Sequence, residues 1–285
     1  MSMLFHRWPL LSGCGSLASS RLACSLVPRV PDAVWGKVAG YDCLVPLDDL
    51  VGRAILLVGD LDRKVTWALD RLVRPGDTVL DVGANLGLVS LLMARRVGAE
   101  GQVFAFDPSP RILPYLRATL AANSGLPIVL EDHALGRTED RLTLHVPAGN
   151  AGCASLVEGR AGDFSVEVAV RPLSAVFADR GITRVDFMKI DVEGFEAEVL
   201  QGLFDDASAP RPCVILFEEN APATSLSFGL LRDEGYRLFG LPKRSYFSVT
   251  LVADGRPGFA DCHDYMALRA DLPANRTRFL APSGI

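Results

Sequence analysis

The sequence predicts an α/β fold built on a doubly wound, mostly parallel β-sheet. Two observations support this. From residue 74 onward, short apolar runs alternate with segments of helical periodicity, and glycine or proline ends several of these runs. Strands that alternate with helices of this length form parallel βαβ units with right-handed crossovers. A chain of 285 residues accommodates one such domain and a small N-terminal subdomain.

The predicted strands and helices follow one another in order. DTVLDVG is the first strand, and the helix after it, LGLVSLLMARRVG, ends at Gly98. GQVFAFDP is the second strand, Ser109 is the N-cap candidate of the next helix, and PIVLEDHALG is the third strand. After residue 171, the runs RVDFMKIDVEG, FEAEVLQGL, PCVILFEEN and ATSLSFGLLRDEGY resume the order strand, helix, strand, helix.

The pattern breaks between residues 141 and 171. The runs RLTLHV and FSVEVAV alternate with period two on either side of a glycine-rich loop. Such alternation predicts strands rather than helices, so we expect an inserted antiparallel β-hairpin here.

Four segments are expected along the chain. Residues 1–31 form a leader or disordered segment, 32–73 an N-terminal subdomain with the helix VTWALDRLV, 74–250 the ligand-binding domain, and 251–285 a C-terminal tail. The leader contains no acidic residue but several Ser and three Arg, a composition that resembles an organelle transit peptide. A loosely docked leader is the favoured interpretation.

Charge and cysteine content exclude several function classes. The net charge is -5 and no block of Lys and Arg occurs, so nucleic acid is not an expected partner. No apolar run is long enough to span a bilayer. The six cysteines show neither C-x-x-C nor zinc spacing, so we expect no metal, reduced thiols and a cytoplasmic location, with organelle targeting by the leader as the alternative.

The first motif with chemical meaning is LDVGANLG, residues 80–87, where an apolar strand turns into a helix. Gly83 and Gly87 have no side chain, so the backbone there approaches a ligand closely. In open α/β sheets, ligands bind at this end of the strands. The motif departs from G-x-G-x-x-G because the third glycine is absent, which weakens a dinucleotide interpretation. Its alternative is an ordinary tight turn.

The second motif is FAFDP. Asp107 falls at the end of the second strand, 24 residues after Gly83. A carboxylate there accepts hydrogen bonds from the two hydroxyls of a ribose. The alternative is an acid that merely begins the turn before Pro108.

The third and fourth motifs end two further strands. In DFMKIDVEGFE, Lys189 and Asp191 share one face of a strand, and Glu193 follows them. They form either an ion pair that fixes strand register or, as we favour, the polar wall of an active site. In ILFEEN, Glu218 lies at the same sheet edge and could face the cleft, whereas Glu219 is expected to be exposed.

At these positions the chain resembles the FkbM family of methyltransferases. The matching pieces are PGDTVLDVGANLG, the acidic end of FAFDP, ALG at 134–136, NAGCASL and above all VDFMKIDVEGFEAEVLQG. The resemblance covers residues 44–240 or so. It implies a class I methyltransferase fold, which is Rossmann-like, with S-adenosylmethionine as cofactor. It also implies O-methylation of sugars or of hydroxyls on secondary metabolites.

The resemblance also implies roles for individual residues. The methionine end of the cofactor would be lined by Asp81, Gly83, Asn85 and Gly87. Asp107 would hold the ribose, Asp132 and His133 would lie near the adenine, and Asp191 and Glu193 would face the reacting centre. One departure stands upstream, where relatives often carry an aromatic–Glu pair and this chain has Asp60-Leu61-Asp62. That departure puts a role of the N-terminal segment in substrate closure in doubt.

The predicted activity is therefore S-adenosylmethionine-dependent methylation of a hydroxyl on a small molecule or glycan. Asp191 and Glu193 are the first candidates for a general base, followed by Glu218 and His133. Metal assistance ranks lower because no ligand spacing is visible. One alternative is a nicotinamide-dependent oxidoreductase, which the missing third glycine and the absence of a Tyr-x-x-x-Lys pair disfavour. The other is a non-catalytic cofactor-binding protein.

Overall fold

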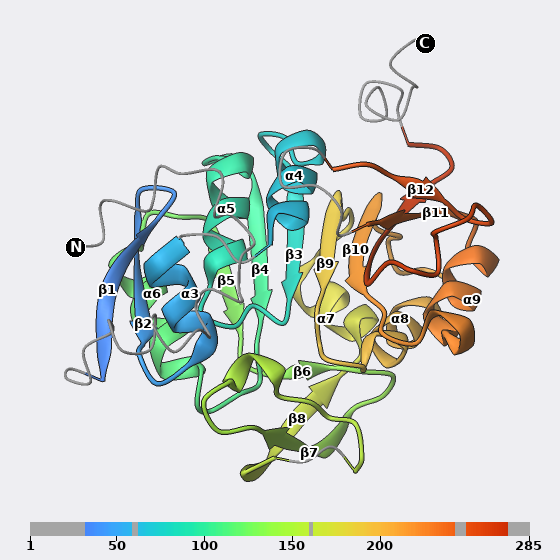
Figure 1. Ribbon diagram of the computed structural model, residues 1–285. Helices are drawn as coiled ribbons and strands as arrows, with labels where there is room; N and C mark the ends of the chain where they lie inside the picture. The colour runs from blue at the N-terminus through green and yellow to red at the C-terminus, as the bar shows by residue number, and fades with distance from the viewer. Residues whose placement is uncertain (1–31, 59–61, 160–161, 243–248, 273–285) are drawn as a thin grey trace.

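The computed structural model describes residues 32–58, 62–159, 162–242 and 249–272, and the expected leader lies outside the described residues (Figure 1). A central sheet runs in the order β12 (Val252–Ala253), β11 (Tyr236–Leu241), β13 (Asp264–Arg269), β10 (Val214–Glu218), β9 (Phe187–Ile190), β3 (Thr78–Val82), β4 (Gln102–Phe106), β5 (Ile128–Glu131). The strands from β5 to β10 are parallel, and β13 is antiparallel to both of its neighbours. This is the strand order of a class I methyltransferase, and it confirms the predicted fold class.

Helices cover both faces of this sheet. One layer holds α4 (Arg63–Leu72), α5 (Leu88–Val97) and α6 (Leu113–Ala122), and the other α7 (Leu173–Arg180), α8 (Glu196–Phe204) and α9 (Leu226–Asp233). Successive strand residues point to opposite faces, so Val79 packs in the cluster with α4 and α5, whereas Leu80 packs with α7 and α8. Strands buried on both faces read as continuous apolar runs, which explains the sequence pattern.

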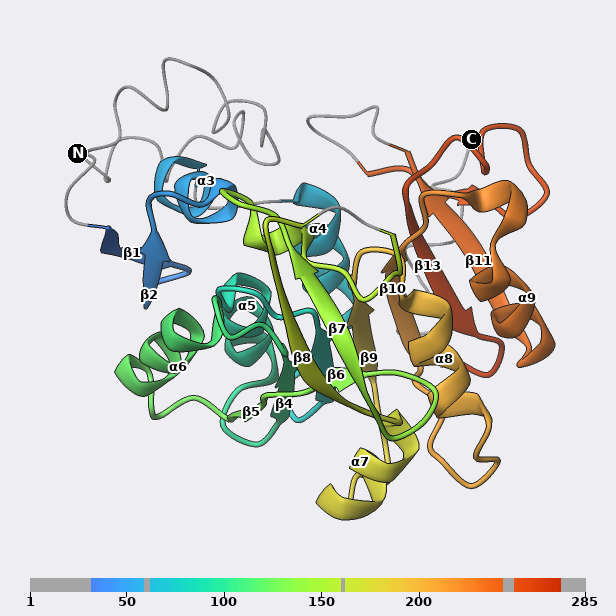
Figure 2. The same ribbon diagram turned by 90° about the horizontal axis from the view of Figure 1, so that it is seen from below.

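The predicted hairpin is present as part of a second sheet. It consists of β6 (Ala134–Leu135), β8 (Phe164–Arg171) and β7 (Asp140–Val146), in that order. β7 and β8 are antiparallel, with Leu144 opposite Val166. Figures 1 and 2 show this sheet beyond the carboxyl ends of the parallel strands, where a ligand would bind.

The N-terminal subdomain begins with a hairpin, β1 (Ala33–Val38) and β2 (Tyr41–Pro46), followed by α3 (Leu50–Val58). Strand β2 lies along α6, and Leu44 N donates to Thr119 Oγ1 at 3.0 Å. Among the described residues, no helix combines the length and apolar character needed to cross a lipid bilayer.

Three expectations about element boundaries are corrected. The stretch expected as a tail contains β13, whose core residues are buried between β10 and β11, so the central sheet continues past residue 250. The sequence before it is interrupted by Pro and Gly, which hides the strand. Helix α6 has Ile112 rather than Ser109 at its N-cap, because a turn closed on the Ser109 carbonyl precedes it. Helix α5 starts at Leu88, two residues later than expected.

Two short 3-10 turns, η1 (Ala151–Cys153) and η2 (Pro222–Thr224), complete the described elements.

Candidate active site

A cavity of about 330 Å³ opens at the carboxyl ends of β3 and β9. The strand order reverses between these two strands, because β4 and β5 lie on one side of β3 and β10 lies on the other side of β9. Such a switch point leaves a crevice in which α/β proteins bind ligands. The N-terminal subdomain and the second sheet contribute further walls, including Val51, Asp62 and Leu144.

The loop between β3 and α5 forms the floor of this cavity. The amides of Gly83 and Ala84 both donate to the Phe106 carbonyl, at 3.0 and 2.9 Å, which ties the loop to β4. Gly83 and Asn85 have φ angles of 81° and 51°, in the left-handed region that favours glycine. A Cβ on Gly83 would lie 1.9 Å from the Asp191 carbonyl oxygen. Gly83 is thus required by the close approach of two strand ends.

Asp107 lies at the end of β4 and lines the cavity. One carboxylate oxygen accepts from Asn85 N at 2.8 Å and the other from Ser109 N at 2.9 Å. Burial raises the pKa of Asp107 to about 6, and these two hydrogen bonds work against the rise. A carboxylate oxygen has two lone pairs, so each can still accept one further donor from a ligand.

Lys189 on β9 connects the carboxyl ends of β9 and β3. Its ammonium donates to the Gly83 carbonyl at 3.1 Å and lies 3.1 Å from Asp191 Oδ2 and 3.6 Å from Asp81 Oδ1. Although burial opposes the charged form, Asp191 and Asp81 raise the pKa of Lys189, so it stays charged. Asp81 is fully buried and also accepts from Ser90 Oγ at 2.6 Å. The expected ion pair and the expected polar wall are therefore the same group of side chains.

The loop after β9 carries Glu193, which has a positive φ of 55°. Ser155 Oγ donates to the Glu193 carbonyl at 2.8 Å, which links this loop to the glycine-rich segment. Glu196 Oε1 accepts from the amides of Val192 and Gly194 at 3.2 and 3.3 Å. The sequence analysis missed Glu196, although an acid in the first turn of a helix is a recognisable capping signal.

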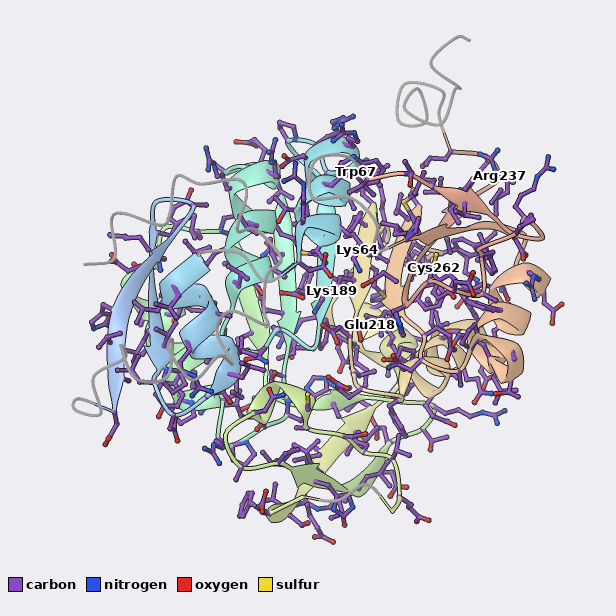
Figure 3. The ribbon with its side chains drawn as sticks, viewed as in Figure 1. Lys64, Trp67, Lys189, Glu218, Arg237 and Cys262 are labelled. Atoms are coloured by element: carbon purple, nitrogen blue, oxygen red, sulfur yellow. The ribbon has the colours of Figure 1, made fainter. Side chains whose placement is uncertain are left out.

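Glu218 lies at the end of β10 and lines the cavity beside Asp191. Burial raises its pKa to about 8, with contributions from Asp191, Asp264 and Glu193. Among the described residues, no donor lies within hydrogen-bonding distance of its carboxyl group. Figure 3 labels Glu218, Lys189 and Lys64 near the centre of the view. The sequence analysis missed Lys64 and Asp264, whose side chains form an ion pair next to this cavity.

The roof of the cavity is held by Asp49, which the sequence analysis also missed. This side chain is 1% exposed. Its Oδ2 accepts from Ala151 N at 2.6 Å and its Oδ1 from Val51 N at 2.8 Å. Leu50 N donates to the Gly149 carbonyl at 2.9 Å. Helix α3 and the glycine-rich loop are therefore joined across the cavity.

Six of the predicted site residues line the cavity: Gly83, Asn85, Asp107, Asp191, Glu193 and Glu218. Asp81 and Gly87 lie behind the wall, where Asp81 pairs with Lys189 and Gly87 leaves room for Leu116.

The structure does not bring Asp132 or His133 into the cavity. Asp132 is exposed and pairs with Arg117 at 2.5 Å, while His133 is buried with its ring edge-on to Phe106. Burial lowers the pKa of His133. The next residue along the chain, Ala134, lines the cavity in their place.

Comparison with known proteins identifies the family. The methyltransferase FkbM domain matches residues 81–238, which is more than half of the chain. The chain belongs to the FkbM methyltransferase family.

Individual relatives agree with this assignment. The chain is similar to 31-O-demethyl-FK506 methyltransferase FkbM of Streptomyces tacrolimicus, with 30% identity over 229 residues that cover 69% of this chain and 82% of the relative. It is also similar to methyltransferase sdnD of Sordaria araneosa, with 29% identity over 189 residues that cover 55% and 73%. An O-methyltransferase from Bacillus cereus, solved in complex with SAH, has a TM-score of 0.43 at 13% identity and covers 72% of this chain and 79% of that chain. The fold assignment rests on the strand order of the central sheet.

Membership of the FkbM methyltransferase family makes S-adenosylmethionine the cofactor and excludes the oxidoreductase alternative. The cavity fits such a cofactor. Within the described part of the chain, Asn85 Oδ1 and Ser109 Oγ are buried in its walls and have no hydrogen-bond partner. Buried polar atoms without partners are rare and point to a bound polar group. No group of three or more His, Cys, Asp or Glu among the same residues is arranged to hold a metal ion.

Proposed function

We propose that this FkbM methyltransferase transfers a methyl group to a hydroxyl oxygen of a small molecule or glycan. One observation carries the proposal. The acids Asp191, Glu193 and Glu218 line the same cavity as Gly83, Asn85 and Asp107. An alcohol is a weak nucleophile at neutral pH, so a carboxylate within reach of it assists the transfer.

Two further observations support a small hydroxylated acceptor. The name of the Streptomyces tacrolimicus relative describes methyl transfer to 31-O-demethyl-FK506, a reaction at oxygen. The net charge of -5 is unsuited to a polyanionic nucleic acid acceptor.

When bound, S-adenosylmethionine supplies a methyl group on a sulfonium and leaves as a neutral thioether. The residues of the chain position and deprotonate the acceptor. Glu218, which has no donor among the described side chains, takes the proton of the acceptor hydroxyl. Asp191 is ion-paired with Lys189, which holds its carboxylate in place as an anchor for the acceptor hydroxyl. Glu193 lines the cavity beside them.

On the cofactor side, the carboxylate of Asp107 accepts hydrogen bonds from the ribose hydroxyls through its free lone pairs. Gly83 and Asn85 border the methionine end, and Asp81 and Gly87 support this loop from behind. Ala134 takes the place near the adenine that was expected of Asp132 and His133.

A screen with methyl-labelled S-adenosylmethionine tests the function. Hydroxylated glycans, lipids and secondary metabolites are incubated with the protein, and the labelled atom of each product is located by mass spectrometry. Asp107→Asn is the control, because it should bind the cofactor about tenfold more weakly. With the labelled cofactor kept at a low concentration, we expect label on oxygen with the wild-type protein and much less with the control.

Label found only on nitrogen or carbon would contradict O-methylation. Normal binding of S-adenosylmethionine in calorimetry, with no transfer to any acceptor, would favour the alternative of a non-catalytic cofactor-binding protein.

A further inference from the structure

Glu218 has a second carboxyl group directly opposite it on the neighbouring strand. In the antiparallel pairing of β10 with β13, Glu218 and Asp264 are register partners. Side chains of such partners point to the same face, with Cβ atoms about 4.5–5.5 Å apart. Asp264 is 6% exposed. Glu218 and Asp264 therefore lie next to each other in a partly desolvated site at the cavity wall.

Helix α4 places a cation over this pair. Lys64 Nζ contacts Asp264 Oδ2 and lies 3.3 Å from Asp62 Oδ2. The position of Lys64 is fixed, because Asp62 is the N-cap of α4 and accepts from Lys64 N at 2.7 Å. Although burial opposes the charged form, Asp264 and Asp62 raise the pKa of Lys64. Lys64 therefore stays charged and keeps Asp264 ionised in turn.

Resting on the proposed function, we propose that Asp264 is a positioning residue whose negative charge makes Glu218 a strong proton acceptor, and that Lys64 holds Asp264 in place. A like charge nearby disfavours ionisation, so Glu218 takes up a proton more readily than an isolated carboxylate. Lys64 contacts Asp264 from α4, so its positive charge acts first on Asp264 and only at longer range on Glu218.

The remaining charged groups near Glu218 belong to β9 and the loop after it. Asp191 and Glu193 add negative charge, and Lys189 offsets part of it. The pKa of Asp264 is raised to about 6, first by burial and then by Asp62, so Asp264 is mostly ionised at neutral pH, whereas Glu218, with a pKa of about 8, is ionised in a minority of molecules, which are the ones that accept the proton. A base works best when its pKa lies close to the operating pH.

Methyl transfer to the acceptor changes three bonds. The acceptor oxygen forms a bond to the methyl carbon, the carbon–sulfur bond breaks, and the O–H bond of the acceptor breaks. The proton passes to the ionised carboxylate of Glu218 and then leaves to solvent through the cavity. Asp264 touches neither the acceptor nor the cofactor in this scheme.

Titration of Glu218 by NMR tests the proposal without an acceptor. The protein is labelled with ¹³C at glutamate side-chain carboxyls and saturated with S-adenosylhomocysteine, and the Glu218 signal is assigned by its loss in Glu218→Gln. Asp264→Asn should lower the midpoint of Glu218 by about one pH unit. The variant should fold, because Lys64 keeps Asp62 as a partner. Asp271→Asn is the matched control, since it removes the same charge just past the other end of β13, at an exposed ion pair with Arg269.

A lowered midpoint in Asp264→Asn and an unchanged one in Asp271→Asn would support the proposal, and an unchanged midpoint in both would overturn it. If Asp264→Asn does not fold, Lys64→Gln is the second variant. The midpoint of Glu218 should rise in it, since a nearby cation is lost, and no change would overturn the proposal.

With an acceptor in hand, the acidic limb of the pH–rate profile should move with the midpoint. A limb that stays in place while the midpoint moves would refute the role in catalysis. Absence of transfer to any acceptor counts against the proposed function. The titration needs no acceptor, so it still tests the effect of Asp264 on Glu218.

Discussion

The ammonium of Lys189 lies 3.1 Å from Oδ2 of Asp191, at the point where β9 ends in the cavity. The same ammonium has two other partners, Asp81 and the Gly83 carbonyl. Loss of the Asp191 charge therefore leaves Lys189 paired, so a substitution of Asp191 can lower activity without unfolding the protein.

Asp191→Asn should lower kcat by about 10²-fold or more while S-adenosylhomocysteine affinity changes only a few-fold, because an acceptor anchor acts mainly in the transition state. Kinetics, calorimetry and thermal melts are measured together. Asp205→Asn serves as control, since it removes a carboxylate from an exposed pair with Arg137. A well-folded Asp191→Asn enzyme with wild-type turnover would show that Asp191 has no part in the reaction.

Cofactor affinity should depend on the ionisation of Asp107. Its pKa of about 6 lies above the value of about 3.9 for an unfolded chain, so the folded state holds the extra proton between these values. The contribution of this group to stability is therefore largest at low pH and is lost as the pH rises through 6. Cofactor binding runs the other way, because the ribose hydroxyls need the ionised carboxylate as acceptor.

We expect the affinity for S-adenosylhomocysteine to fall as the pH drops from 7.5 to 5, and Asp107→Asn to remove this dependence. At pH 7.5 the variant should bind about tenfold more weakly, the equivalent of about 1.4 kcal/mol. Calorimetry over this pH range measures both effects. A pH-independent wild-type affinity would disprove the ribose assignment.

Gly83 and Gly98 offer a matched pair of glycine substitutions. Both have positive φ angles, 81° and 66°, so alanine is strained at either position by about 1–3 kcal/mol. Only at Gly83 would the new Cβ also collide with a backbone atom, the Asp191 carbonyl oxygen.

Gly83→Ala should therefore lose much more stability than Gly98→Ala, and should also lose cofactor binding. Chemical unfolding and calorimetry provide the comparison. Equal losses in the two variants would mean that the strand ends can separate without cost.

The sequence predicted those parts of the site that lie at strand ends. Asp107, Asp191 and Glu218 each follow an apolar run, and the carboxyl ends of parallel strands meet at one edge of the sheet. Local periodicity is enough to find such residues. Asp132 and His133 do not line the cavity, because β5 is an edge strand after which the chain turns away into β6, and their role near the adenine stays a prediction.

Lys64, Asp264 and Asp49 could not be found in this way. Each lies behind the cavity wall and is held there by contacts between distant parts of the chain, since Lys64 and Asp264 are 200 residues apart and Asp49 and Ala151 are 102 apart. Strand β13 enters the sheet in antiparallel orientation between β10 and β11, which no local pattern encodes. Asp62 belongs to the segment that departs from the family pattern, and its place as the N-cap of α4 on the cavity wall became visible only in the structure.

Asp49 should control how fast the cofactor exchanges. Its two carboxylate oxygens accept from Val51 N and Ala151 N, and both of these residues line the cavity. Asp49→Ala removes these two hydrogen bonds and a longer one from Gly52 N, so α3 and the glycine-rich loop should separate more often. We expect S-adenosylhomocysteine to dissociate about tenfold faster, which corresponds to the loss of about 1.4 kcal/mol from the closed state. Asp48→Ala is the control, because this exposed neighbour pairs only with Arg111 among the described residues. Stopped-flow displacement measures the rates, and thermal melts check folding. Equal dissociation rates in a folded Asp49→Ala protein and the wild type would mean that the cofactor leaves by a route that does not open this roof.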